Sequence, residues 1–217
     1  MAYSDENGVF FNKLGITDEK ALAGAEYQIT ARKAAAWPLQ ECKTPFNLRR
    51  LKETHQFLFE DVYDWAGKVR TVPSKKRHPG GTGLSTFEAP EKIVLAWAAL
   101  ESKIILFQQS YVSQSDQINE LTAIFIEANR IHPFPEGNGR SLQLFMKEFG
   151  ASLNIDLDFS RVDTIRWNDA CAVSAPYEKL YERGLVKIPS AGDTAPIKKV
   201  FSDIAIEKQS SLRDSEL

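Results

Sequence analysis

Apolar residues recur every three or four positions along most of this 217-residue chain, and no other feature constrains its fold as strongly. That spacing places side chains on one face of an α-helix. Because helices normally bury such faces in a core, the stripes predict a mostly α, bundle-like fold and say nothing about function. The clearest stripes are Leu22, Ala25 and Ile29; Leu51, His55, Leu58 and Val62; Ile93, Trp97, Leu100 and Ile104; Ile118, Leu121, Phe125 and Ala128; and Leu142, Phe145 and Phe149.

Local signals set the expected helix boundaries. The first helix should end before Trp37-Pro38, because a residue that precedes proline disfavours the α region. A second helix is expected from about Leu48 to Trp65, with Gly67 as its C-terminal cap. One further helix is expected to start at Pro90, and the next at a cap on Ser115 or Asp116. The helix after the glycine loop should end at Gly150, and two more are expected near 162–172 and 175–183.

The segment 68–87 breaks the helical pattern. It is rich in glycine, proline and basic residues, and two short β-prone pieces flank its centre. This composition predicts an exposed β-hairpin, here called the flap, although a solvated basic loop is the plainer alternative. The two β-prone pieces are Val69, Arg70, Thr71 and Val72, and Leu84, Ser85, Thr86 and Phe87.

Composition excludes several classes of protein. The formal net charge of −2 gives no overall attraction to nucleic acid, and no apolar run approaches the length of a membrane span. The polar N-terminus does not resemble a signal peptide. Two cysteines, Cys42 and Cys171, are too few for a disulfide framework, so a reducing, cytoplasmic setting is the simplest expectation, with secretion into a host cell left open.

The segment from His132 to Arg140 carries the chemistry. Gly137 and Gly139 permit a tight turn and close approach to a ligand, and the helix that follows leaves backbone N–H groups free to bind phosphate. Arg140 can add further donors, Glu136 can hold Mg²⁺ against the phosphates, and His132 can accept a proton. Together they indicate a phosphate-transfer site. A phosphate-binding P-loop does not fit, because Arg140 stands where its lysine belongs.

This segment resembles the motif H-P-F-x-[D/E]-G-N-[G/K]-R-x-x-R of the Fic family. His132, Pro133, Phe134, Glu136, Gly137, Asn138, Gly139 and Arg140 all match. The resemblance extends over roughly 48–181, with support from His55, Phe59 and the run 62–70. It implies a Fic-type helical bundle with a small β-hairpin flap, divided into an N-terminal helical extension (1–45), a Fic core (46–190) with the active loop at 132–140, and a C-terminal tail (191–217).

The resemblance also implies an activity, namely transfer of AMP from ATP to a Tyr, Ser or Thr hydroxyl of a target protein. His132 would be the base, Glu136 the Mg²⁺ ligand, and Gly137, Asn138, Gly139 and Arg140 the nucleotide-binding residues. Phe134 would anchor the loop. The flap residues 69–72 and 84–87 would pair with an extended segment of the target. Glycine at position 139 favours AMP transfer, because phosphorylating relatives carry lysine there.

The chain departs from the motif at its last position, where Gln143 replaces an arginine that holds the terminal phosphate in relatives. Glutamine carries no charge, so the chain could use another nucleotide donor or could be a nucleotide-binding module that has lost catalysis. The inhibitory motif [S/T]-x-x-x-E-[G/N] has no good copy, since Ser174 and Glu178 are followed by Lys179. If the chain is a toxin, either a separate small antitoxin protein supplies the inhibitory glutamate, or the chain is regulated in another way. Gln143 could not form the salt bridge that this glutamate usually makes with the motif arginine.

Overall fold

The computed structural model describes residues 3–37, 45–110 and 113–207, and Cys42 lies outside them. The described residues form seven α-helices and six short strands. The helices are α1 (Glu19–Ala36), α2 (Leu48–Phe59), α3 (Ile93–Gln109), α4 (Gln114–Ile131), α5 (Asn138–Ser152), α6 (Thr164–Val173) and α7 (Ala195–Ile204). The strands are β1 (Lys75–Arg77), β2 (Gly83–Thr86), β3 (Ile155–Leu157), β4 (Tyr177–Tyr181), β5 (Val186–Ser190) and β6 (Ala205–Glu207).

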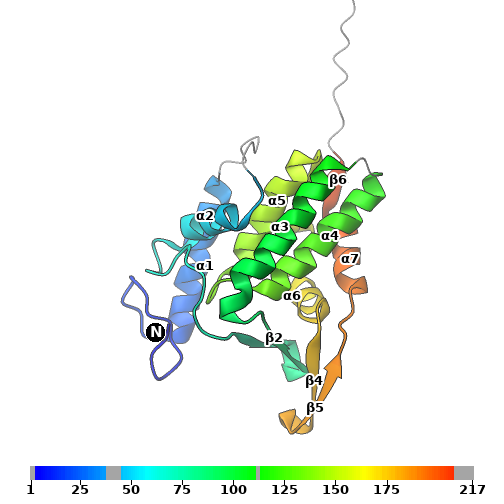
Figure 1. Cartoon of the computed structure of the whole chain (residues 1–217). Coiled ribbons are helices and arrows are strands. Elements are labelled where there is room, and N and C mark those ends of the chain that lie inside the picture. The colour runs from blue at the N-terminus through cyan, green and yellow to red at the C-terminus, as the bar shows by residue number, and fades with distance from the viewer. Residues whose placement is uncertain (1–2, 38–44, 111–112, 208–217) are drawn as a thin grey trace, which may run out of the picture.

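The centre of the molecule is a bundle in which α3, α4 and α5 lie side by side (Figure 1). The predicted apolar stripes build its core, since Trp97, Phe125 and Phe145 are almost completely buried. The mostly α fold is thus confirmed, and helical periodicity identified the faces that are buried. Helix α7 also belongs to this core, because Ile197 and Phe201 are buried against the bundle.

Helices α1 and α2 cover one side of the bundle (Figure 1). Helix α1 ends at Ala36 with Trp37 as its cap, as the following proline predicts. Helix α2 ends at Phe59 and not near Trp65, so that prediction is wrong. The chain turns there because Val62 and Tyr63 both donate backbone hydrogen bonds to the Phe59 carbonyl, and the Tyr63 ring stacks on Trp65 with centroids 4.1 Å apart.

Three other boundary predictions need correction. Ser113 caps α4, in place of Ser115 or Asp116, because its side chain accepts the Asp116 N–H. Helix α5 continues through Gly150 to Ser152. The helix expected at 175–183 is strand β4, whose backbone is paired with β2 on one side and with β5 on the other. This long-range pairing determines the conformation there over the local preference of the segment.

The flap is larger than the predicted hairpin. Strands β1 and β2 pair as expected of a hairpin, but β2 also pairs with β4, which gives an antiparallel sheet in the order β1-β2-β4-β5. The first half of the predicted hairpin is wrong, since the residues 69–72 form no strand. Arg70 is 1% exposed, and its guanidinium donates hydrogen bonds to backbone carbonyls that strand pairing would leave out of reach.

Strand β6 pairs with β3 directly after α7, so the chain up to residue 207 takes part in regular structure. The frayed end expected at 210–217 lies outside the described residues. Among the helices that the structure describes, none has both the length and the apolar character needed to cross a bilayer.

A buried ion pair joins α2 to α5. The Glu148 side chain is fully buried and accepts hydrogen bonds from Arg50 Nε at 3.0 Å, from Arg50 Nη2 at 2.5 Å and from Trp37 Nε1 at 2.8 Å. The Arg50 guanidinium also lies 5.0 Å from the Trp37 ring centroid. This cluster therefore fixes the position of α5, the helix that follows the 132–140 loop.

Substitution of Arg50 by leucine should destabilise the fold strongly, because it leaves the Glu148 carboxylate buried without its charged partner. We expect a loss of about 3–5 kcal/mol in the free energy of unfolding measured by urea denaturation. Arg49→Leu is the matched control, since the Arg49 side chain is 86% exposed, and its change should stay within about 0.5 kcal/mol. Equal losses in the two variants would contradict a structural role for the buried pair.

Candidate active site

The loop 132–140 joins the end of α4 to the start of α5 through two left-handed residues. His132 caps α4 with a φ of 50°, and Gly137 precedes α5 with a φ of 80°. A side chain at position 137 would also collide with Phe59, because a Cβ there would lie 2.3 Å from the Phe59 ring. Glycine is therefore required at 137 on two counts, by its backbone angle and by its packing.

The Asn138 side chain closes the loop onto Phe134. Its Oδ1 accepts the Phe134 N–H at 2.8 Å, and its Nδ2 donates to the Phe134 carbonyl at 2.8 Å. Phe134 is fully buried and stacks on His55 with centroids 3.8 Å apart, which confirms its expected role as an anchor. The Asn138 side chain thus holds the loop in shape, and only the backbone of Asn138 is free to serve a ligand.

Two buried residues hold the backbone of the loop from outside. Arg70 donates to the carbonyl of His132 at 2.8 Å and to that of Glu88 at 2.5 Å, so it occupies an orphan carbonyl at the end of α4. His55 Nδ1 accepts the Gly67 N–H, which leaves the proton on Nε2 to be donated to the Glu136 carbonyl at 3.0 Å. Burial lowers the pKa of His55 to about 3, so His55 is neutral and serves as a structural bridge.

His132 is arranged as a proton acceptor. Its Nδ1 donates to the Asn129 carbonyl at 3.2 Å, since a carbonyl can only accept, and this leaves a lone pair on Nε2. The ring stacks on Phe87 with centroids 3.6 Å apart. Burial, and next the charge of Lys76, lower the pKa of His132 to about 3, so the imidazole is neutral near pH 7. The side chain is only partly exposed but lines two cavities, so it can be reached by a ligand.

The start of α5 offers backbone donors beside His132. Its first intrahelical hydrogen bond runs from the Ser141 N–H to the Gly137 carbonyl. The N–H groups of Asn138, Gly139 and Arg140 come before that bond and have no acceptor within the helix. Gly139 is exposed, and a Cβ on it would meet nothing within 4 Å. This helix end therefore has the geometry of an anion site.

The Arg140 guanidinium has protein partners that the sequence did not suggest. It donates to Glu26 on α1 at 2.5 Å and to the Thr30 hydroxyl at 3.0 Å, and it lies 3.5 Å from a Glu136 oxygen. Glu26 is 6% exposed and also accepts the hydroxyl of Tyr63. Arg140 is consequently bound between two carboxylates in this structure, in contrast to the open phosphate contact that was expected of it.

Glu136 stands where a metal ion could join a carboxylate to a phosphate. Its Oε1 accepts the Gly137 N–H at 2.8 Å, and its side chain is 44% exposed toward cavities that Gly139 also lines. Within the described residues no three His, Cys, Asp or Glu side chains converge on a point. A single carboxylate suits Mg²⁺, which in nucleotide sites takes its other ligands from phosphate and water.

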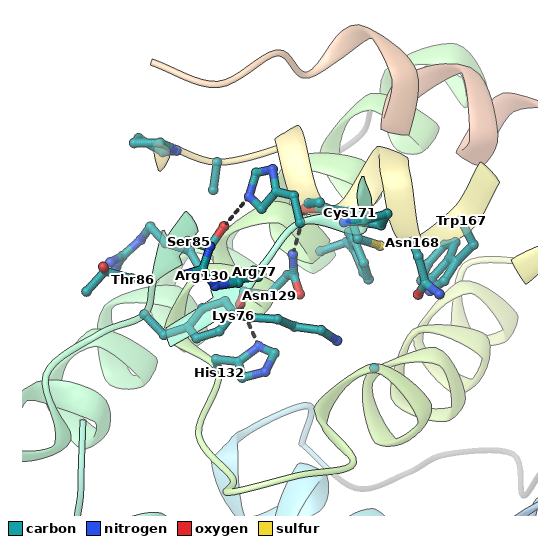
Figure 2. Close-up of a pocket in the computed structure, with 18 residues that line it drawn as sticks. Lys76, Arg77, Ser85, Thr86, Asn129, Arg130, His132, Trp167, Asn168 and Cys171 are labelled. Atoms are coloured by element: carbon teal, nitrogen blue, oxygen red, sulfur yellow. Dashed lines mark hydrogen bonds between the residues drawn. The ribbon is translucent and has the colours of Figure 1, made fainter. Parts of the chain in front are cut away.

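A cavity of about 270 Å³ opens beside His132, between the flap sheet and helices α4 and α6 (Figure 2). Its walls combine aromatic rings with amide groups, including Phe125, Trp167, Asn129 and Asn168. Because Gly139 and His132 also line it, the cavity is continuous with the start of α5. The other wall is formed from the flap by residues that include Lys76, His78, Ser85 and Phe87.

The expected docking residues are only partly placed as predicted. Ser85 and Thr86 lie in β2, whose two edges are already occupied by β1 and β4, so β2 cannot accept a further strand. Phe87 packs against the His132 ring. The outer strands of the sheet are β1 (Lys75–Arg77) and β5, and β1 is the one that belongs to the flap; the residues 69–72 do not contribute to its edge.

Several residues near the site were missed or ambiguous in the sequence. Glu26 was missed and Arg70 was assigned to the docking flap, because each acts through a contact distant in sequence. Gln143 lies with Arg140 along the walls of two other cavities. Ser174 and Glu178, which have the spacing of an inhibitory motif, are divided between the end of α6 and strand β4, so they do not share a helix.

Comparison with known proteins agrees with this geometry. Residues 45–149 match the model of the Fic/DOC family. Over 163 residues the chain is 29% identical to "Protein adenylyltransferase VbhT" of Bartonella schoenbuchensis. The aligned region is 74% of this chain but 33% of that protein, so the chain matches about a third of its length. It is 25% identical over 199 residues to "Probable protein adenylyltransferase Fic" of Escherichia coli, covering 90% of this chain and 87% of the relative.

The fold also matches solved structures. The crystal structure of the effector BepC of Bartonella tribocorum with bound AMPPNP superposes with a TM-score of 0.79 at 21% identity, over 95% of this chain and 97% of that one. At such identity the likeness concerns the fold. The family match covers residues 45–149, which include the whole loop 132–140, and the likeness to BepC extends over the rest of the fold.

Proposed function

We propose that the chain is a protein adenylyltransferase, which moves AMP from ATP to a hydroxyl of another protein and releases pyrophosphate. The observation that carries the proposal is the lone pair on His132 Nε2, oriented by the Nδ1 contact to Asn129 and placed beside the free N–H groups of α5. A proton acceptor beside a helix start is the arrangement needed to activate a hydroxyl next to bound phosphate. The names of the relatives support the same reaction.

The chemistry follows from these two parts. The target hydroxyl oxygen forms a bond to the α-phosphorus, the bond from that phosphorus to the bridging oxygen breaks, and pyrophosphate leaves with the electron pair. The hydroxyl proton passes to His132 Nε2. The N–H groups of Gly139 and Arg140 hold the phosphate oxygens on which charge is concentrated. Since the pKa of His132 is lowered by burial, the imidazole is already unprotonated when substrate arrives.

The nucleoside fits the cavity between the flap sheet and α6. Trp167 and Phe125 provide apolar walls for a planar base, and the amides of Asn129 and Asn168 provide donors and acceptors. The bound AMPPNP in the BepC structure supports an adenine nucleotide as the ligand. Glu136 would hold Mg²⁺, which when bound supplies positive charge to the phosphates.

The target would bind at the open edge of β1. A strand added there would extend the sheet through main-chain hydrogen bonds, which accept many sequences and still align the hydroxyl. The three residues of β1 are all basic, so an acidic or neutral segment suits this edge better than a basic one. We propose this edge in place of the segments 69–72 and 84–87.

Gln143 supports a second candidate within the same class, a transferase that uses a different nucleotide donor. Its side chain lies near Arg140, where the family motif has a charged residue. A neutral amide holds a terminal phosphate less firmly than a guanidinium. The further alternative, a binding module without catalysis, is less favoured because His132 and Glu136 both retain a geometry that serves transfer.

Transfer can be measured with ATP labelled at the α-phosphate, Mg²⁺ and a cell lysate. We expect label on a protein band, and a decrease of about a hundredfold or more in His132→Ala with ATP affinity preserved, because the variant lacks the base but keeps the anion site. Label from another nucleotide alone would favour the second candidate. Nucleotide binding without transfer from any donor would favour the binding module and contradict the proposal.

Gly137→Ala and Gly139→Ala separate structure from ligand binding within one turn. Gly137→Ala should lower the free energy of unfolding by about 2 kcal/mol or more, because of its positive φ and the Phe59 ring. Gly139→Ala should be neutral or stabilising by up to about 1 kcal/mol, since position 139 is helical and open. Its methyl group should nevertheless weaken ATP binding in calorimetry, and unchanged affinity would argue against phosphate at this helix start.

Gln143→Arg tests the choice of donor. Restoring the charge should raise the affinity for ATP by about tenfold, because a charged hydrogen bond to phosphate is worth about 1.5–3 kcal/mol. The affinity for AMP, which lacks the terminal phosphates, should stay the same. Equal affinity of wild type and variant for ATP would mean that position 143 does not face the polyphosphate.

A further inference from the structure

Apart from the Mg²⁺ ion that Glu136 would hold, the motif offers no free basic side chain to the phosphates. Arg140, the only charged basic side chain within the motif, is held between Glu26 and Glu136. Those two carboxylates offset the positive charge of the guanidinium. Binding to a ligand would also require Arg140 to leave a contact of 2.5 Å with a buried acid. Position 143 is neutral. A triphosphate therefore needs a positive charge from elsewhere in the fold.

Lys76 of the flap is the residue placed to supply that charge. It lines the cavity beside His132, and also the two neighbouring cavities that Glu136 and Gly139 line. Figure 2 shows its side chain extended across the cavity above the His132 ring. A single side chain thus borders all three cavities that Gly139 lines at the start of α5.

The register of the flap explains this direction. Lys76 is paired with Ser85, and the Ser85 hydroxyl contacts His78, which follows directly after β1. Because side chains alternate across a strand, Lys76 and His78 share the face turned toward the cavity. Arg77 also lines the cavity beside His132, and Lys75 lines one of the neighbouring cavities, but of the three residues of β1 only Lys76 lines all three cavities.

No ion pair involves Lys76 among the residues that the structure describes, whereas Arg140 and Arg130 each bind acids. The effect of Lys76 on its surroundings is also visible in His132, since its positive charge contributes to the lowered pKa of that imidazole. The ammonium group is consequently near the proton acceptor and, within the described part of the chain, forms no ion pair with a carboxylate.

We propose that Lys76 is a substrate-contacting residue of the transfer reaction, which donates hydrogen bonds from its ammonium group to non-bridging phosphate oxygens of the nucleotide at the start of α5. This inference rests on the proposed function. Lys76 contributes hydrogen-bond donors and positive charge, and the proton of the target hydroxyl goes to His132. As the bond to pyrophosphate breaks, the lysine charge stabilises the oxygens of the transferred phosphate.

A second consequence concerns the coupling of target and nucleotide. Lys76 lies in β1, the strand whose outer edge is open for a target segment, and its side chain reaches the nucleotide site. A target strand that orders β1 would also order the Lys76 ammonium over the phosphate. Lys76 thus links the docking edge, through its backbone in β1, to the transferred phosphate, through its side chain.

The test compares Lys76→Met with the control Lys179→Met, which removes the same charge from an exposed position of β4 in the same sheet, outside all three cavities. Binding of Mg²⁺-ATP and of adenosine is measured by calorimetry, and transfer by the α-phosphate label. We expect Lys76→Met to lose about tenfold to a hundredfold in ATP affinity, with adenosine affinity unchanged. Lys179→Met should match wild type in both, and Lys76→Arg should recover most of the loss.

Two results would overturn the role of Lys76: ATP affinity equal to that of wild type in Lys76→Met, or an equal loss for ATP and adenosine, which would indicate a damaged pocket. Failure of the proposed function gives a different pattern. A wild-type chain that binds ATP and transfers nothing refutes adenylyl transfer, and the selective loss of ATP affinity in Lys76→Met would then still establish the phosphate contact.

Discussion

The site depends on the paired hydrogen bonds between the Asn138 side chain and the backbone of Phe134. These bonds close the loop on itself, and the left-handed turn at Gly137 then starts α5 with its first N–H groups toward the cavity. Phe134 is buried against His55, so the loop cannot shift without opening the core. An anion site formed in this way is preorganised, because the backbone donors need no rearrangement when phosphate arrives.

Charge is distributed around this loop in two separate systems. The acids Glu26 and Glu136 bind Arg140 on the side of α1, and the flap presents Lys76 on the side of the cavity. The two histidines nearest the loop are both neutral, since burial lowers the pKa of each to about 3. They differ in what they contact: His55 bonds backbone groups through both ring nitrogens, while His132 bonds a backbone carbonyl through Nδ1 alone.

The sequence predicts the parts of the fold that are encoded locally. Helical stripes identified Trp97, Phe125 and Phe145 as core residues, and the glycine pattern located the loop. The residues 69–72 and 175–183 were misassigned because their conformations depend on distant partners, namely the carbonyls held by Arg70 and the pairing of β4 with β2. Likewise the pairing of Arg140 with Glu26 joins positions 114 residues apart, which no spacing rule can detect. The face of β1 that carries Lys76 could be assigned only once the register was known.

The most direct measurement of the central claim is an NMR titration of the backbone amides with Mg²⁺-ATP. If phosphate binds at the start of α5, the amide protons of Gly139 and Arg140 should move downfield together as the nucleotide saturates the site, because each gains a charged acceptor. The Asn138 side-chain amide should hardly move, since its partner Phe134 does not change. Saturable binding that shifts only residues around Trp167, with both backbone amides unaffected, would contradict the account.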